Sequence, residues 1–270
     1  MLIWQLSLHT PGSGKRGVSA LFIDDQHPLP EQIPVLAANE IHLWLANLQP
    51  SPERLARLAA TLTVDERERA ARFRFPGHRD RFIAGRGLLR ELLGAYLNRM
   101  AATLRFSQGS RGKPMLADEH SEGLHFNLSH SSDRVLYAIA YREVGVDLEA
   151  MDRRLDYTAV AERICTPHEW TFFQALPAEQ ARESFFACWT RKEAIAKALG
   201  DGLAYGLNKL DAGFQDDERV NRRISLHDAA GQEWSVQNLP LEPGWAGALA
   251  APHTDWHWRM LTLGKLGISD

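Results

Sequence analysis

The chain has 270 residues, a formal net charge of −3 and 44% hydrophobic residues, a composition typical of a globular protein with a sizeable core. The acidic balance argues against a general nucleic-acid-binding protein, and no apolar run reaches the roughly 20 residues needed to cross a membrane. The two cysteines lack metal-type spacing and indicate a reducing compartment, so we expect a cytoplasmic protein.

The elements predicted for the first part of the chain are one strand and three helices. The first 40 residues are rich in proline and glycine and indicate a loop-rich lead-in. Residues 41–48 alternate like a strand, and Ser51 then caps a helix that begins with proline. Thr63 and Glu66 form a capping-box pattern that opens a second helix. Residues 78–99 carry apolar side chains at helical spacing and predict a long third helix.

A basic stretch runs through these helices. Between Arg67 and Arg90 there are eight arginines and two acidic residues, a local charge of +6 against −9 for the rest of the chain. Such a concentration in an acidic protein favours binding of a specific anionic partner, although a solvated arginine face has the same composition.

The order of elements repeats farther along the chain, and every match falls at one offset of 103 residues. The matched positions are Ile41 with Val144, Leu43 with Val146, Leu45 with Leu148, Thr63 with Thr166, Glu66 with Glu169, and Phe82 with Phe185. The repeat predicts an α+β fold of two similar halves related by a pseudo-two-fold axis. We expect the halves to be residues 1–142, with the arginine-rich region, and residues 143–270.

Three acidic residues of the second half form a candidate metal site. Asp147 and Glu149 lie two residues apart on a predicted strand, so both project from one face. Glu193 lies on a predicted helix, four residues after Trp189 and four before Lys197. Oxygen ligands of this kind suit Mg²⁺. An exposed strand face and a surface Glu–Lys pair have the same spacing, and two-metal nucleases use similar acids.

The first copy does not share these acids, because the equivalent positions are Trp44, Ala46 and Arg90. Lysines beside Glu193, namely Lys192 and Lys197, are candidates to contact the same phosphates. Upstream, the segment FNLSHSS (126–132) brings Ser129 and His130 to a turn as donors for phosphate oxygens, although a capped turn with a surface histidine reads the same way. Lys113 lies in another turn.

In chain order, the segments GKPML, FNLSHS, VGVDLE and FFACWTRKEAIAKALG resemble the motifs of the Sfp-type 4′-phosphopantetheinyl transferases, over about residues 63–205. This family resembles a fused pair of the small subunits of holo-acyl-carrier-protein synthases, and the resemblance implies that each half is a small antiparallel sheet packed with helices. The resemblance implies that the chain moves the 4′-phosphopantetheine arm of coenzyme A onto a carrier-protein serine and releases adenosine 3′,5′-bisphosphate.

The resemblance also implies roles for individual residues. Asp147, Glu149 and Glu193 would hold Mg²⁺, Glu193 would also be the general base, and Lys197 would bind the pyrophosphate as a second catalytic residue. The coenzyme A contacts would be Ser129 and His130 with the phosphoadenosine, Lys113 on the nucleotide side, and Arg81 and Arg86 with phosphates.

The expected partners are coenzyme A and an apo carrier protein of acyl, peptidyl or polyketide type, with no nucleic acid and no membrane, and we expect a monomer. Two alternatives stay open at this point. A metal-dependent phosphodiesterase would use the same acids and hydrolyse its substrate without an acceptor. A non-catalytic module that binds coenzyme A or a carrier is expected to have lost part of the acidic triad.

Overall fold

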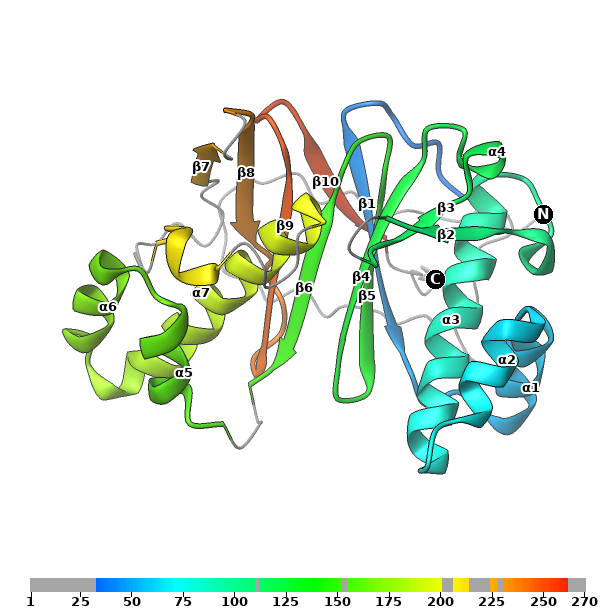
Figure 1. Cartoon of the computed structure of the whole chain (residues 1–270), viewed down its shortest axis with the longest axis horizontal. Coiled ribbons are helices and arrows are strands. Elements are labelled where there is room, and N and C mark those ends of the chain that lie inside the picture. The colour runs from blue at the N-terminus through cyan, green and yellow to red at the C-terminus, as the bar shows by residue number, and fades with distance from the viewer. Residues whose placement is uncertain are drawn as a thin grey trace, which may run out of the picture.

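The computed structural model describes residues 33–109, 112–151, 155–200, 206–213, 224–227 and 231–261. The loop-rich lead-in expected for the first 40 residues lies mostly outside these ranges. Two four-stranded sheets stand side by side at the centre, and helices cover both outer flanks (Figure 1). This arrangement confirms the α+β fold with two similar halves.

The first half follows the predicted order. It contains β1 (Glu40–Asn47), α1 (Pro52–Ala60), α2 (Val64–Ala71), α3 (Pro76–Tyr96), a 3-10 turn (Ala101–Thr103), β2 (Phe106–Gln108), β3 (Pro114–Leu116), α4 (Asp118–Ser121), β4 (His125–Ser131) and β5 (Arg134–Ala140). The Ser51 hydroxyl accepts from the Arg54 amide at 3.2 Å and caps α1. The Thr63–Glu66 capping box opens α2, as the sequence predicts.

The second half repeats the strand and three helices. It contains β6 (Gly145–Ala150), α5 (Tyr157–Ile164), α6 (Pro167–Gln174), α7 (Ala178–Leu199), a 3-10 turn (Leu207–Lys209), β7 (Ile224–His227), β8 (Glu233–Asn238), β9 (Trp245–Pro252) and β10 (His257–Leu261). Helices α2 and α6 match residue for residue at the offset of 103, and both open with a capping box.

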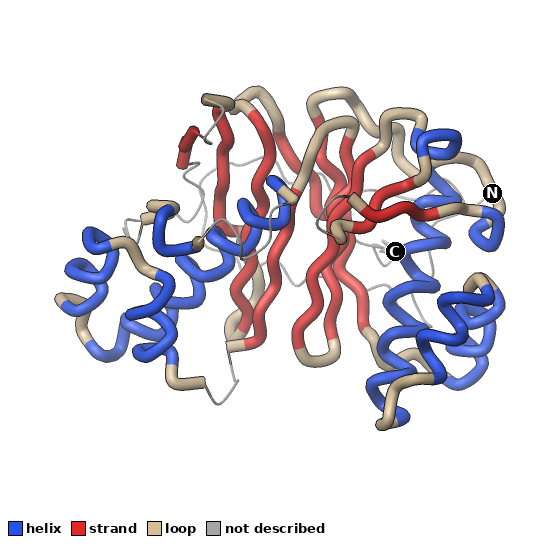
Figure 2. Tube along the Cα trace, viewed as in Figure 1, coloured by secondary structure: helices blue, strands red, loops and turns tan. Residues whose placement is uncertain are grey.

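The sheets share one plan. Figure 2 shows the strands of both sheets in red. The first sheet has the order β10–β1–β5–β4 and the second the order β6–β9–β8–β7, with antiparallel pairing throughout except for the parallel pair β1–β10. β10 is the last described strand of the second half in sequence but lies in the first sheet. The boundary at residue 142 stays a prediction, and among the described strands β10 of the second predicted half joins the sheet of the first half.

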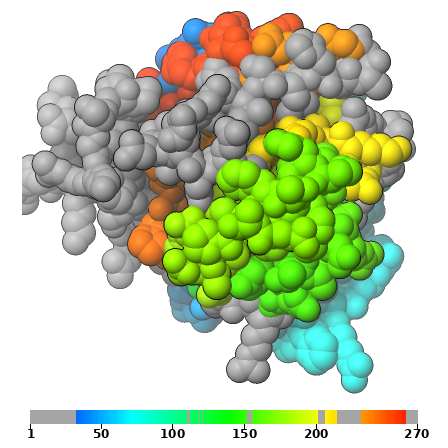
Figure 3. Space-filling model, turned by 90° about the vertical axis from the view of Figure 1, so that its left-hand side faces the viewer, coloured from blue at the N-terminus to red at the C-terminus, as the bar shows by residue number. Residues whose placement is uncertain are grey.

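Because side chains alternate along a strand, one face of β1 and β6 packs between the two sheets and the other face packs against helices. Ile41, Leu43 and Leu45 of β1 meet Val146 and Leu148 of β6 in one cluster between the sheets. The opposite face of β1 packs Trp44 and Ala46 against α3. On β6 that opposite face carries the two acids, and α7 packs against it and against β9. Helices α5 and α6 cover α7 on the outside and form the flank seen in Figure 3.

No helix within the described residues combines the length and apolar character that a membrane crossing requires.

Candidate active site

The site lies at the seam between β4 and β6, the neighbouring edge strands of the two sheets. Polar side chains of β4 contact residues of β6 that lie 18 or 19 positions later in the chain, so the two strands run parallel. The Asn127 carboxamide oxygen accepts from the Val146 amide at 2.9 Å, and the Ser131 hydroxyl accepts from the Ala150 amide at 3.1 Å. Polar side chains of β4 therefore satisfy backbone groups on the edge of β6, where a paired strand would otherwise be needed.

Asp147 lies buried in this seam with only 3% of its surface exposed. Its Oδ1 accepts from the Ser129 hydroxyl at 2.8 Å and from the Lys197 ammonium at 2.6 Å, and that ammonium also contacts the Ser129 hydroxyl at 2.7 Å. Its Oδ2 is buried and has no hydrogen-bond partner among the described residues. A buried carboxylate oxygen without a partner is costly unless a cation or water reaches it.

The second carboxylate, Glu149, is held between the halves. Its Oε2 accepts from the Ser131 hydroxyl at 2.8 Å, and its Oε1 accepts from the Trp189 indole at 3.3 Å. Trp189, Glu193 and Lys197 lie four residues apart, so they form one stripe along α7, and this stripe faces β6.

Glu193 completes the acidic group. Burial raises the pKa of its carboxyl above the ordinary value; Asp147 raises it further, Lys197 opposes this, and Glu149 adds a smaller increase. The charges of Asp147 and Glu149 thus act on Glu193. Within the described part of the chain, no three His, Cys, Asp or Glu side chains are grouped as a ready-made metal site. The Lys197 ammonium is the cation that contacts Asp147 in this arrangement.

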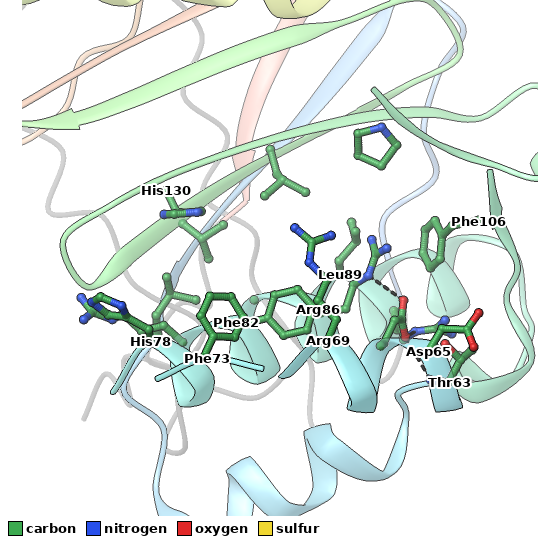
Figure 4. A pocket seen from close by; sticks show the side chains of 18 of the residues that line it. Thr63, Asp65, Arg69, Phe73, His78, Phe82, Arg86, Leu89, Phe106 and His130 are labelled. Carbon is green, nitrogen blue, oxygen red and sulfur yellow. Dashed lines mark hydrogen bonds and ion pairs between the residues drawn. The ribbon is translucent and has the colours of Figure 1, made fainter. Parts of the chain in front are cut away.

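A cleft of about 1270 Å³ opens beside the seam, between α2, α3, the β2–β3 hairpin and β4 (Figure 4). Aromatic rings and arginines line it, and Figure 4 shows Phe73, Phe82 and Arg86 along its floor with His130 at one end and Phe106 at the other. Glu149 also lines the cleft, so the cleft reaches the acids.

Three of the predicted phosphate contacts line this cleft: Arg81, Arg86 and His130. Arg86 donates to Glu66 at 2.6 Å, and its guanidinium lies 4.3 Å from the centre of the Phe106 ring. Arg81 donates to the Ser132 carbonyl at 3.2 Å and so anchors the turn that follows His130. Removal from bulk water, together with the charges of Lys197 and Arg81, lowers the pKa of His130.

The other two predicted coenzyme A contacts have partners elsewhere. Ser129 is bonded to Asp147 and Lys197, as described above. The Lys113 ammonium donates to Glu143 at 2.7 Å and to the Ala198 carbonyl at 2.9 Å, which ties the β2–β3 region to the end of α7. Either residue would have to leave these partners to contact a nucleotide.

The expectation for Lys192 is wrong. Its side chain is completely buried and forms an ion pair with Glu169 at 2.7 Å, and its ammonium also donates to the Leu207 carbonyl at 2.8 Å. On a helix, adjacent residues point about 100° apart, so a lysine next to Glu193 cannot share its face. Lys192 therefore secures the segment after α7 and is closed to phosphate.

Comparisons with known proteins agree with this architecture. The sequence model of the 4′-phosphopantetheinyl transferase superfamily matches residues 143–251, and the model described as 4′-phosphopantetheinyl transferase, N-terminal, matches residues 46–141. The 4′-phosphopantetheinyl transferase HetI of Nostoc is 46% identical over 231 residues, which cover 85% of this chain and 94% of the relative. The chain belongs to the 4′-phosphopantetheinyl transferase family.

Two further members of the family are more distant. The transferase psf-1 of Bacillus pumilus is 31% identical over 82% of this chain and 94% of its own length. The transferase Sfp of Bacillus subtilis is 26% identical over 76% of this chain and 89% of its own length. The resemblance inferred from the ordered motifs is thereby confirmed.

In this phosphopantetheinyl transferase, the positions equivalent to the acids have become core in the first half. Trp44 is buried and its indole donates to the Tyr96 hydroxyl at 2.9 Å. Arg90 is 1% exposed, pairs with Glu66 at 2.7 Å and donates to the Ala101 carbonyl at 2.9 Å. Within the described residues, the carboxylate group on a strand–helix pair therefore occurs once.

Sequence reasoning missed Asn127 and Ser131, which join the halves, and the role of Trp189 as a donor to Glu149. The signal for the first two was present, because Asn127, Ser129 and Ser131 alternate along one strand and must share a face. What the sequence could not show is that this face lies against β6.

Proposed function

We propose that this transferase moves the 4′-phosphopantetheine group of coenzyme A onto a serine hydroxyl of an apo carrier protein at the β4–β6 seam. The products are holo carrier protein and adenosine 3′,5′-bisphosphate. The observation that carries the placement is that Asp147 and Glu149 share one face of β6, with the Lys197 ammonium against Asp147 and an arginine-lined cleft that reaches Glu149.

Asp147, Glu149 and Glu193 are the residues that we propose hold Mg²⁺. The partnerless buried Oδ2 of Asp147 supports this proposal, as does the all-oxygen donor set. Magnesium sites commonly use one or two carboxylates and take their other ligands from water and substrate phosphates, so a preassembled triad is not required. When bound, magnesium stabilises negative charge on the pyrophosphate and on the leaving phosphate.

The residues of the chain itself then divide the work. The Lys197 ammonium is the proposed contact of the pyrophosphate. To bind it, the ammonium would leave Asp147, its present partner. Glu193 faces the same group and is our candidate acceptor for the proton of the attacking serine, either directly or through one water. His130, Arg81 and Arg86 line the cleft and are proposed to bind the remaining phosphates of coenzyme A. We retain Ser129 and Lys113 only as contacts that form after their present partners are released.

The acceptor is proposed to be an apo carrier of acyl, peptidyl or polyketide type. A monomer is supported by the duplication, since the second half packs against the first in one chain. The free, buried Cys165 and Cys188 support a reducing, cytoplasmic location. Neither a nucleic acid nor a membrane surface is part of the proposal.

The test is the mass of an apo carrier protein after incubation with coenzyme A and Mg²⁺. We expect a gain of one phosphopantetheinyl group, and Asp147→Ala and Glu193→Gln should each lose most of the rate while they keep the fold. Glu162→Gln, at an exposed carboxylate of α5, is the matched control and should transfer normally. Full activity in either folded site variant would refute the site assignment. Hydrolysis of coenzyme A without an acceptor would instead indicate a phosphodiesterase.

A further inference from the structure

Ser131 is placed between the two halves in a way that the reaction described above does not explain. It is the last residue of β4, and its side chain is 6% exposed. Its hydroxyl has two partners on β6: the Ala150 amide at 3.1 Å and Glu149 Oε2 at 2.8 Å. A side chain of the first half thus contacts a proposed magnesium ligand of the second half.

The direction of these two hydrogen bonds is determined by their chemistry. A serine hydroxyl has one hydrogen to donate and lone pairs that accept. The Ala150 amide can only donate, so Ser131 accepts from it and the hydroxyl hydrogen is left for Glu149. An ionised carboxylate only accepts, and a hydrogen bond to it is charge-assisted and about twice as strong as a neutral one. The backbone of β6 thereby orients the hydroxyl toward its own neighbouring carboxylate.

We infer that Ser131 is a positioning residue that holds the Glu149 carboxylate in the orientation in which it binds a divalent cation. Trp189 holds the other oxygen from α7 at 3.3 Å, so the carboxylate lies between a donor from each half. The inference rests on the proposed function, because it assumes that Glu149 is a metal ligand. Donors that orient a ligating side chain contribute about 10–100-fold to metal affinity.

Asn127 offers a matched control on the same strand face. Its carboxamide oxygen accepts from the Val146 amide at 2.9 Å, so it makes the same kind of seam bond as Ser131. The hydrogen bonds of its side chain do not involve either acid of β6 in the described structure. Asn127→Ala and Ser131→Ala each leave one amide of β6 without its acceptor, and only the second also removes a donor to Glu149.

The experiment is a titration of the full-length protein with Mn²⁺, followed by electron paramagnetic resonance, with and without coenzyme A and in the absence of carrier. We expect Ser131→Ala to weaken Mn²⁺ binding about 10–100-fold. Ser131→Thr keeps the hydroxyl and should stay within a few-fold of the unmodified protein. Asn127→Ala should melt at a lower temperature but bind Mn²⁺ normally. If Ser131→Ala does not fold, Ser131→Cys keeps the shape with a weaker donor and should give an intermediate loss.

Two results would overturn the inference: unchanged Mn²⁺ affinity in the folded Ser131 variants that lack the hydroxyl, or an equal loss of affinity in Asn127→Ala. The second would mean that the seam as a whole, and not the hydroxyl, supports the cation site. Failure of the proposed function looks different. In that case the unmodified protein binds no Mn²⁺ even with coenzyme A present, or Glu149→Gln and Asp147→Ala bind it as well as the unmodified protein does.

Discussion

Gly145, the first residue of β6, is where α7 comes closest to the sheet. A Cβ built at this glycine would lie 2.0 Å from the Ala194 carbonyl oxygen and 2.4 Å from the Ala198 nitrogen, whereas ordinary contact begins at 3.4 Å. The shortfall of about 1.4 Å is against helix backbone atoms, which cannot rotate away as a flexible side chain can. Gly145→Ala must therefore separate α7 from β6 or bend one of them.

The consequence reaches the site because both elements carry it. Overpacking of a filled core costs about 1–3 kcal/mol, and a clash with backbone belongs at the upper end, so we expect a loss of about 3 kcal/mol in the free energy of unfolding. The same displacement moves Glu193 and Lys197 away from Asp147, which Lys197 now contacts at 2.6 Å. A misplacement of about 1 Å in reacting groups can cost roughly 100-fold in rate.

Urea unfolding measures the first effect, and the initial rate of carrier modification at saturating coenzyme A measures the second. Gly77→Ala, near the start of α3, is the control because the nearest atom to its added Cβ would be the Arg81 side chain at 3.8 Å. It should be neutral or stabilising by up to about 1 kcal/mol, since alanine is the better helix former. A Gly145→Ala protein with unchanged urea midpoint and unchanged rate would show that the close packing of α7 on β6 is not what assembles the site.

Two further predictions concern buried charges. Lys192→Met leaves Glu169 as a buried anion without its cation and should lower the free energy of unfolding by about 3–5 kcal/mol. In urea unfolding, the double variant with Glu169→Gln should lose clearly less than the sum of the two single variants. Additive losses would contradict the coupling. Burial raises the pKa of Glu66, but hydrogen bonds from Arg90 and Thr63 and the nearby arginine charges outweigh it, so the net pKa is lowered from 4.5. The stability that ionised Glu66 contributes is therefore complete above about pH 4.5 and is lost as the pH falls through the lower folded-state pKa. The difference in free energy of unfolding between the unmodified protein and Glu66→Gln should therefore shrink on acidification. A difference that grows toward pH 3 would contradict this sign.

Features encoded locally were predictable from the sequence. The capping boxes at Thr63 and Thr166 depend on residues three apart, and the stripe of Trp189, Glu193 and Lys197 depends on helical period alone. The strand alternation that places the acids opposite Val146 and Leu148 is equally local. Each of these needs only the spacing of residues within one element.

Features that depend on which elements meet were not predictable. Lys113 was expected to contact a nucleotide, but the Ala198 carbonyl, 85 residues away, accepts from its ammonium. β10 belongs to the second half in sequence and yet pairs with β1 in the first sheet. No periodicity identifies the partner of an edge strand, and for the same reason the contact between β4 and β6 was found only in the structure.

The two halves also suggest how one of them came to carry the acids. Each half buries the glutamate of its capping box, and each such glutamate needs a cation. In the first half Arg90 supplies it at 2.7 Å from Glu66, together with Arg86 at 2.6 Å. In the second half Lys192 supplies it, one position earlier in the repeat than the equivalent of Arg90. With Lys192 in this role, position 193 does not have to neutralise Glu169, so an acidic side chain there leaves Glu169 paired. The same position can then face β6, where its carboxylate joins Asp147 and Glu149 as a proposed ligand of Mg²⁺.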